Sequence, residues 1–127
     1  MGEDRRTARD AADDRVSLGA ALPLRGRVYY VRKGERFKIG YTEWLRARML
    51  KLRPDELLAV EPGGRDLETR RHHMFADERI TPRGEWFRPS ERLILHIYAC
   101  RDAHPVPDLD AMLRRRHADG RDKWVQW

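Results

Sequence analysis

The chain has 127 residues with a formal net charge of +6, and 40% of the residues are hydrophobic and 38% are charged. This size favours one domain with a modest core and a heavily ionised surface. No apolar run approaches the roughly 20 residues that a membrane-spanning helix needs, and the N-terminus lacks the apolar segment of a secretory signal. A single cysteine, Cys100, cannot form an internal disulfide, so we expect a cytoplasmic protein that binds no membrane.

The positive charge is concentrated in one segment of the chain. Residues 25–53 contain ten Lys and Arg against two Glu, a net charge of +8, whereas residues 1–15 and 54–100 are both slightly acidic. A clustered basic surface is typical of a protein that binds the phosphate backbone of nucleic acid. The alternative is an arginine-rich composition that only keeps the surface solvated, but the clustering favours nucleic acid.

The first half of the chain predicts a tail, a hairpin and a helix. Residues 1–24 are polar and charged without a sustained apolar face, so we expect a flexible tail there. Two short β-type runs, 27–32 and 37–40, flank a glycine-containing turn and predict a β-hairpin. Thr42 is a suitable N-cap for a helix that continues to about Leu52.

The second half predicts one more strand and three helices. A short apolar run at 57–60 indicates a third strand, and Asp66 is the expected N-cap of a helix that reaches about Ala76. Ser90 is the expected N-cap of the next helix, and residues 108–117 form the last one. The apolar stripe of the helix after Ser90 comprises Leu93, Ile94, Ile97 and Tyr98.

Several short motifs, taken in their order and spacing, resemble the GIY-YIG nuclease superfamily. Val28-Tyr29 corresponds to the first half of its motif. Lys38-Ile39-Gly40 corresponds to the second half, in the form that a phage-type branch carries. No single match is specific, but their order is informative. The further matches are Tyr41-Thr42, Arg48, Glu68, His72, Phe75 and Gly84-Glu85-Trp86-Phe87.

The resemblance implies an α+β fold, in which a small antiparallel three-stranded sheet is flanked by helices. We assign this domain to residues 25–100, between the charged N-terminal tail and a C-terminal helical extension at 101–127. Trp124 and Trp127 make the extension a candidate interface for a protein partner or for a second copy of the chain.

The resemblance also implies Mg²⁺-dependent (or Mn²⁺-dependent) hydrolysis of DNA, in which a water is activated and charge on the phosphate is neutralised. Tyr29 corresponds to the residue that accepts the proton of the attacking water. Lys38 replaces a tyrosine and can only donate hydrogen bonds and charge, so we expect it to hold the phosphate or to favour the phenolate form of Tyr29. Arg48 corresponds to a phosphate-binding arginine and Glu68 to the metal ligand. One turn after Glu68, His72 is expected beside the metal or the leaving group.

The basic helix is expected to extend the DNA contacts around this site. Arg46 and Arg48 lie about 200° apart around a helix, so only one of them can face Tyr29. We assign DNA contacts to Tyr41, Arg46, Lys51 and Arg53. The chain carries no CxxC or HxxxH pair, so we expect no structural zinc site. It also carries no recognisable sequence-reading module, so we expect low sequence specificity.

Two departures from the superfamily pattern keep a second function open. Lys38 replaces the second tyrosine, and the chain contains no asparagine to match the one that the superfamily often has near the end of the module. The alternative is a nucleic-acid-binding module that has kept the fold and lost cleavage. A protein-interaction domain with a basic surface is a third possibility.

Overall fold

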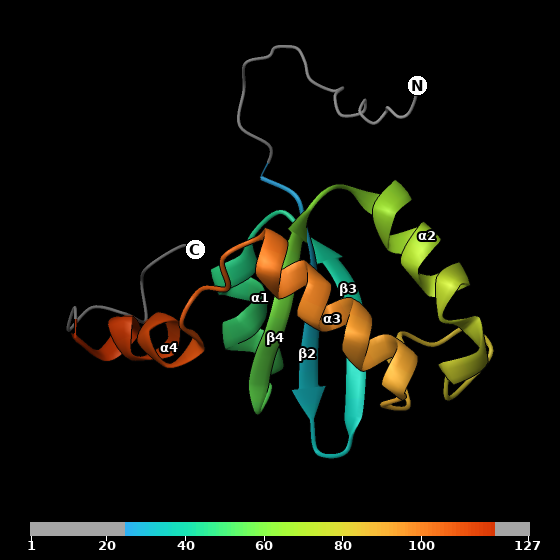
Figure 1. The fold of residues 1–127 in the computed structure, drawn as a ribbon. Coiled ribbons are helices and arrows are strands. Elements are labelled where there is room, and N and C mark those ends of the chain that lie inside the picture. The colour runs from blue at the N-terminus through green and yellow to red at the C-terminus, as the bar shows by residue number, and fades with distance from the viewer. Residues whose placement is uncertain (1–24, 119–127) are drawn as a thin grey trace, which may run out of the picture.

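The computed structural model describes residues 25–118, which form a four-stranded antiparallel sheet with helices on both faces (Figure 1). The strand order across the sheet is β4-β2-β3-β5. The elements are β2 (Arg27–Lys33), β3 (Arg36–Thr42), α1 (Leu45–Leu52), β4 (Glu56–Pro62), α2 (Arg65–Met74), the 3₁₀ helix η1 (Ala76–Glu78), β5 (Trp86–Phe87), α3 (Glu91–Ala103) and α4 (Leu109–Ala118). The α+β class is confirmed, but the expected three-stranded sheet has a fourth strand.

The predicted hairpin is formed by β2 and β3, and its turn contains Gly34. This glycine has a φ of +64°, a left-handed conformation that other residues adopt at a cost. The strand β3 continues to Thr42, which pairs with Arg27 at the end of the ladder. The expectation that Thr42 caps the helix is therefore wrong. Its hydroxyl accepts a hydrogen bond from the Trp44 backbone N–H at 3.0 Å, and α1 begins only at Leu45.

The fourth strand is short and covers only part of the sheet edge. In β5, Phe87 pairs with Phe37 and Trp86 pairs with Lys38. Two residues are too few to show the alternation that predicts a strand, and for this reason the sequence did not indicate β5. Beyond Lys38, the outer edge of β3 lies next to helix α2, which contacts this strand.

The helix α2 begins and ends earlier than expected. Gly64 occupies the N-cap position and Asp66 lies inside the first turn. Its carboxylate is well placed there, because acidic groups stabilise the positive end of a helix. The helix ends at Met74 rather than at Ala76, and the chain then tightens into η1.

The helix α3 begins as predicted, but one of the residues expected in its apolar stripe does not face the core. Ser90 caps it by accepting a hydrogen bond from the Leu93 backbone N–H at 3.1 Å. Leu93 and Ile97 are buried, whereas Tyr98 is 56% exposed. The contact between α3 and the sheet is centred on Leu93, Ile97 and Cys100, so Tyr98 lies at its margin.

The alternating side chains of β2 separate two apolar clusters, one on each face of the sheet. Figure 1 shows α3 in front of the sheet and α1 behind it. The cluster under α3 includes Val28, Tyr30, Ile39, Leu58, Phe75, Phe87, Leu93 and Ile97. The opposite cluster, on the α1 side, includes Tyr29, Val31, Met49, Leu57, Val60 and Met112.

The C-terminal extension contributes to the core of the domain. Helix α4 packs against α1, and Met112 is only 8% exposed within the cluster that contains Tyr29. Val106 and Leu109 pack against the same cluster. The candidate interface residues Trp124 and Trp127, like the N-terminal tail at 1–24, lie outside the described residues.

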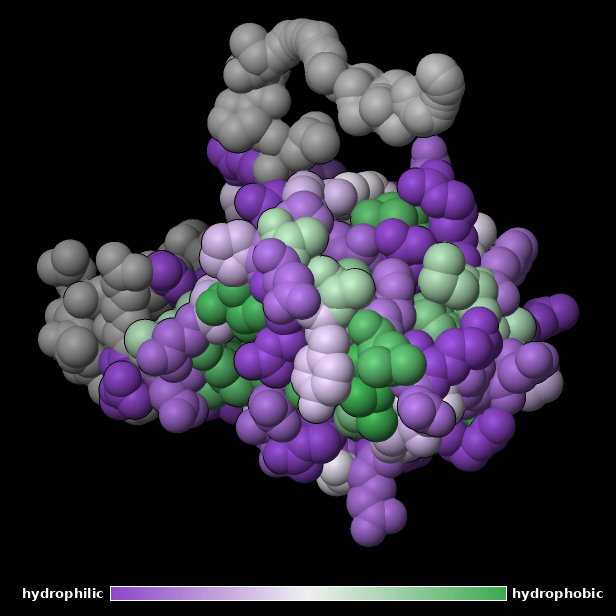
Figure 2. Space-filling view, in the orientation of Figure 1, coloured by the Kyte–Doolittle hydropathy of each residue, from purple (hydrophilic) through white to green (hydrophobic). Residues whose placement is uncertain are grey.

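The surface of the described chain is mostly hydrophilic. Figure 2 shows the face that carries α3, where apolar side chains occur in small separate groups among polar ones. Within residues 25–118, no helix combines the length and the apolar character needed to cross a membrane.

The packing of α4 leads to a first prediction. Met112→Ala should lower the free energy of unfolding by about 2–5 kcal/mol, because it leaves a cavity between α4 and the sheet. Met74→Ala is the matched control. Met74 is 42% exposed on α2, so its loss should change stability by less than about 0.5 kcal/mol. Urea denaturation of the full chain measures both changes, and equal effects would contradict the structural role of α4.

Candidate active site

At the centre of the candidate site, the side chain of Tyr29 packs against Gly40. These two residues face each other across the β2–β3 ladder. A Cβ at position 40 would collide with the hydroxyl and the ring of Tyr29, so the glycine of the Lys38-Ile39-Gly40 motif is what allows the ring to lie across β3. Tyr29 has no exposed surface.

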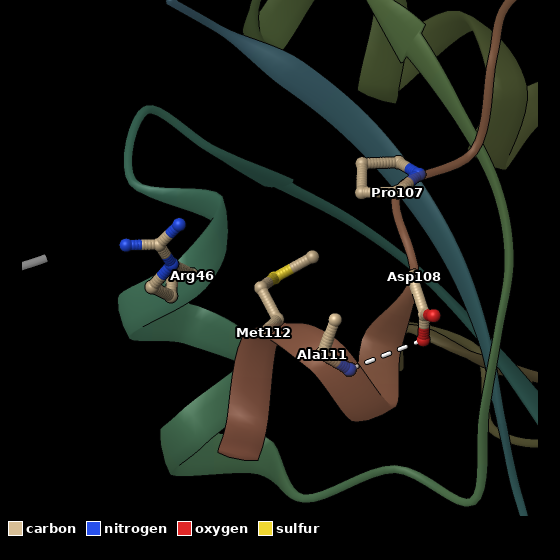
Figure 3. Close-up of a pocket in the computed structure, with 5 residues that line it drawn as sticks. All are labelled: Arg46, Pro107, Asp108, Ala111 and Met112. Atoms are coloured by element: carbon tan, nitrogen blue, oxygen red, sulfur yellow. Dashed lines mark hydrogen bonds between the residues drawn. The ribbon is translucent and has the colours of Figure 1, made fainter. Parts of the chain in front are cut away.

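The helix α1 supplies the partner of the Tyr29 hydroxyl. Arg48 donates a hydrogen bond from Nη1 to the Tyr29 oxygen at 3.2 Å. Arg48 is partly exposed, whereas Tyr29 is buried beneath it. Arg46 lies on another side of α1 and lines a hollow of about 400 Å³ beside α4 (Figure 3). The structure therefore brings Arg48, and not Arg46, to Tyr29, as the helical geometry predicts.

Lys38 shares a sheet face with Tyr29 but is held by other groups. It pairs with Val31, and residues that face each other across a ladder point to the same side. Its ammonium group forms an ion pair with Glu85 and lies 5.5 Å from the centre of the Trp86 ring. Any phosphate that Lys38 holds must therefore compete with the Glu85 carboxylate.

One face of α2 lies along the open edge of β3. The guanidinium of Arg65 lies 5.1 Å from the centre of the Tyr41 ring. Seven residues later, His72 Nε2 lies 2.8 Å from the Ile39 carbonyl oxygen, and we assign the proton of this hydrogen bond to the histidine. Positions i, i+3 and i+7 share one side of a helix, so Glu68 lies between these two contacts. It therefore faces β3 near Gly40.

The two candidate residues of α2 have different surroundings. Glu68 is partly exposed and its carboxylate makes no hydrogen bond or ion pair with any residue of the described chain, so the carboxylate is available to a ligand. His72 bonds the edge carbonyl of β3, and its ring lies 5.3 Å from that of Phe87. In this arrangement His72 fastens α2 to the sheet, and its place beside a leaving group stays a prediction.

The other residues that were assigned to DNA lie at the two ends of α1. Lys51 and Arg53 are exposed at its C-terminal end, where Arg53 adopts a left-handed conformation with a φ of 50°. Tyr41 is partly exposed before the N-terminal end and donates a hydrogen bond to Glu43 at 2.9 Å. This hydrogen bond raises the pKa of the Tyr41 phenol, so the residue stays a neutral donor.

A buried polar network, which the sequence did not indicate, lies on the opposite face of the sheet. The Glu61 carboxylate accepts hydrogen bonds from Tyr30 and, at 2.8 and 3.0 Å, from two nitrogens of Arg71. His96 Nε2 lies 2.9 Å from the Tyr30 oxygen and 3.4 Å from Cys100 Sγ. Tyr30, which the sequence predicted only to pack, thus joins β2 to β4, α2 and α3.

The charges of this network are set by opposing effects. Burial alone would raise the pKa of Glu61, but His96, whose Nε2 lies 3.6 Å away, and the hydrogen bonds from Arg71 and Tyr30 hold that pKa well below its usual range. Burial raises the pKa of Tyr30, and the negative charge of Glu61 adds to the effect. The same two causes, in the same order, raise the pKa of Cys100 to about 12. Glu61 is therefore the anion of the network, and Tyr30 and Cys100 are neutral.

Three members of the network could also hold a metal ion. Ligand atoms of Glu61, His96 and Cys100 all lie within 4.8 Å of one another. Both carboxylate oxygens of Glu61, however, already accept hydrogen bonds from Arg71, whose positive charge opposes a bound cation. The network satisfies its own polar groups, so it does not need a metal to be stable. The inward position of Glu61, two residues after buried Ala59, was the signal that could have revealed it.

The sequence pattern of the T5orf172 domain family matches residues 26–102. The chain belongs to this family. T5orf172 domains are a GIY-YIG-like, phage-type family associated with nucleases. No curated protein and no solved structure matches the chain.

The T5orf172 match runs from β2 to the penultimate residue of α3, and so it contains Tyr29, Gly40, Arg48 and Glu68. It ends before α4, whose Met112 packs in the cluster of Tyr29. Membership makes the domain a nuclease-like or DNA-binding module.

The close approach of Tyr29 and Gly40 leads to a second prediction. Gly40→Ala should lower the free energy of unfolding by about 1–3 kcal/mol, because the new methyl group overpacks a fully buried ring. The nearest atoms to that methyl group all belong to Tyr29. The same substitution in a Tyr29→Leu background should therefore cost much less. A double-mutant cycle from urea denaturation measures the coupling, and additive effects would show that the ring does not impose the glycine.

The Glu61 network leads to a third prediction, on pH. The folded state lowers the pKa of Glu61 below its ordinary 4.5, so its contribution to stability is full above that pH and is lost as the pH falls below it. At neutral pH, Glu61→Gln should cost about 3–5 kcal/mol, because the largely buried Arg71 loses its charged partner. The difference from wild type should shrink as the pH is lowered towards 3.

Glu56→Gln is the matched control on the same strand. Glu56 forms an ion pair with Arg32 at 3.2 Å, and both side chains are substantially exposed. Exposed pairs contribute about 1 kcal/mol or less, so this variant should follow the wild-type curve of unfolding free energy against pH. A Glu61→Gln curve that runs parallel to wild type at every pH would contradict the assignment of Glu61 as a buried anion.

Proposed function

We propose that this protein is a metal-dependent endonuclease that hydrolyses DNA phosphodiester bonds with low intrinsic sequence specificity. The observation that carries the proposal is the contact between Arg48 and the Tyr29 hydroxyl beside Gly40. A phenol and a guanidinium, side by side on a basic face, suit the two needs of the reaction. The phenol can exchange a proton with an attacking water, and the guanidinium can bind two phosphate oxygens.

Substrate binding is proposed to begin with Arg48. Tyr29 is closed off in this structure, so a side chain must move before a phosphate or a water reaches its hydroxyl. Arg48 is bonded to that hydroxyl and is partly exposed, so it is the group whose movement opens the site. When the guanidinium turns to a phosphate, it exchanges a weak neutral acceptor for a charged one, which strengthens its hydrogen bonds. Lys51 and Arg53 would bind the phosphates on either side.

The residues present fit a hard divalent cation of the Mg²⁺ or Mn²⁺ type. Such an ion uses one or two protein carboxylates and keeps water and phosphate oxygens as its other ligands. Glu68 offers a partly exposed carboxylate with no competing partner in the described chain, so it would hold the ion. Glu85 is less suited, because its carboxylate is paired with Lys38. When bound, the ion would neutralise charge on the phosphate and on the departing oxygen.

The chain's own residues would accept the proton and neutralise the remaining charge. Tyr29 Oη would accept the proton of the attacking water, and Arg48 would balance the negative charge that gathers on the phosphate. Lys38 is kept near the same face by Glu85 and Trp86, so it would add positive charge without moving a proton. His72 would keep α2, and with it Glu68, against the edge of β3.

Two observations favour a second candidate function, a DNA-binding module without cleavage. Tyr29 has no exposed surface, and the Lys38 ammonium group is already held in an ion pair with Glu85. A pure binding module needs neither a reachable phenol nor a free carboxylate. The unpaired Glu68 opposes this candidate, because a carboxylate in a basic surface weakens phosphate binding unless a cation occupies it.

The fourth prediction tests cleavage directly. Purified protein should nick supercoiled plasmid with Mg²⁺ or Mn²⁺ and lose this activity in EDTA. Glu68→Gln keeps the helix and the size of the side chain but removes its charge, so nicking should fall by at least about a hundredfold. Tyr29→Phe should have a similar effect, because it removes only the hydroxyl. DNA affinity in EDTA should remain close to wild type in both variants.

Asp66→Asn is the matched control, because it removes an exposed carboxylate from the same first turn of α2. It should nick DNA at the wild-type rate. Near-normal nicking by Glu68→Gln would remove the proposed metal ligand. DNA binding without any nicking by the wild-type protein would establish the binding module instead.

A further inference from the structure

Trp44 occupies a position that neither helix capping nor core packing explains. It is the N-cap residue of α1, a position that Ser, Thr, Asp or Asn normally occupies because their side chains accept backbone hydrogen bonds. The indole can only donate, and in the described chain the Trp44 side chain makes no capping hydrogen bond. Trp44 is 50% exposed and lies outside both core clusters of residues 25–118.

Two aromatic rings, each with an arginine beside it, lie in the last residues before α1. The Arg25 guanidinium lies 4.6 Å from the centre of the Trp44 ring, and the Arg65 guanidinium lies 5.1 Å from that of Tyr41. Gly26 packs closely at the start of β2, since a Cβ there would lie 2.5 Å from the Gly63 carbonyl oxygen and 3.0 Å from Tyr41 Cε1. We call Arg25, Tyr41, Trp44 and Arg65 the aromatic corner.

The chemistry of the aromatic corner matches that of nucleic acid. Flat aromatic faces stack on bases, and arginines bind phosphates or stack in turn. Glu43 is exposed in the same turn and offsets one of the two positive charges. The corner therefore favours a base, recognised through its face, more than it favours a dense row of phosphates.

The aromatic corner is directly connected to the proposed catalytic residues. The Arg48 backbone N–H donates to the Trp44 carbonyl oxygen at 2.9 Å, so the two residues are separated by one turn at the start of α1. A base against Trp44 can therefore belong to the strand whose phosphate Arg48 binds.

A ring can stack on a base only where that base offers a free face. In an intact duplex both faces of each base are covered by its neighbours, so a protein aromatic side chain must unstack them or must find a base that is already unpaired. We propose that Trp44 stacks on an unpaired base of the DNA strand held by Arg48, and that the protein therefore prefers DNA with a bulge, gap or single-stranded end. This inference rests on the proposed action on DNA and adds the class of substrate.

The test compares binding to two short duplexes of the same sequence, one intact and one with a single unpaired base. Fluorescence anisotropy in EDTA measures affinity without cleavage. Wild type should bind the bulged duplex more tightly. Trp44→Ala should bind the bulged duplex about tenfold more weakly, which is the usual effect of losing the stacking between one base and one aromatic side chain. It should change the affinity for the intact duplex little.

Three further variants make the outcome specific. Trp44→Phe keeps an aromatic face and should retain most of the preference, whereas Trp44→Leu keeps apolar bulk and should behave like Trp44→Ala. Tyr98→Ala is the matched control, because Tyr98 is 56% exposed on α3, which packs on the other face of the sheet. It should bind both duplexes as wild type does.

The inference is overturned if wild type shows no preference for the bulged duplex, or if Trp44→Ala weakens binding to both duplexes equally. It is also overturned if Trp44→Leu binds as well as Trp44→Phe. These outcomes are independent of nicking. A protein that prefers the bulged duplex through Trp44 and never cleaves DNA would refute the nuclease proposal and support the stacking site.

Discussion

The buried carboxylate of Glu61 is the charge on which the arrangement of the helices depends. It accepts hydrogen bonds from Tyr30 on β2 and from Arg71 on α2, and His96 on α3 lies beside it. Burying an ion pair costs much of the energy that the pair then recovers, so the main effect of this pair is geometric. Arg71 reaches both oxygens of Glu61 because its side of α2 is turned towards β4. This orientation of α2 also determines where Glu68 lies along the edge of β3.

The alternation of β2 gives two adjacent tyrosines different surroundings. Tyr29 turns towards α1 and meets Arg48, whereas Tyr30 turns towards α2 and α3 and joins the buried network. The candidate site therefore draws on both layers of helices. Helix α2 lies along the edge of β3 near Gly40, where β5 has already ended and, in residues 25–118, no further strand covers that edge. A longer β5 would place another strand between α2 and this edge.

Features that depend on residues close together in the sequence could be predicted, whereas features that depend on how distant elements pack could not. The hairpin and the Ser90 cap follow from local residue patterns, and the sequence predicted them. The period of a helix predicted that only one of Arg46 and Arg48 could face Tyr29, and the family resemblance pointed to Arg48. The strand β5 contains only two residues, too few for any period. The pair of Lys38 and Glu85 joins residues 47 positions apart, and the Glu61 network joins four elements. Contacts of this kind depend on how the elements pack, and no local pattern of residues carries that information.

The cluster around Tyr29 is completed by residues that the family pattern does not include. Val106, Leu109 and Met112 follow the matched residues 26–102, and yet they pack on the same side of the sheet as the ring that crosses Gly40. The packed core of the domain thus includes residues beyond those that the family pattern matches. A change of volume in this last segment reaches Tyr29 by direct packing contact, because a close-packed core transmits displacement. The reactivity of such a tyrosine can therefore diverge in evolution while every residue of the motif stays the same.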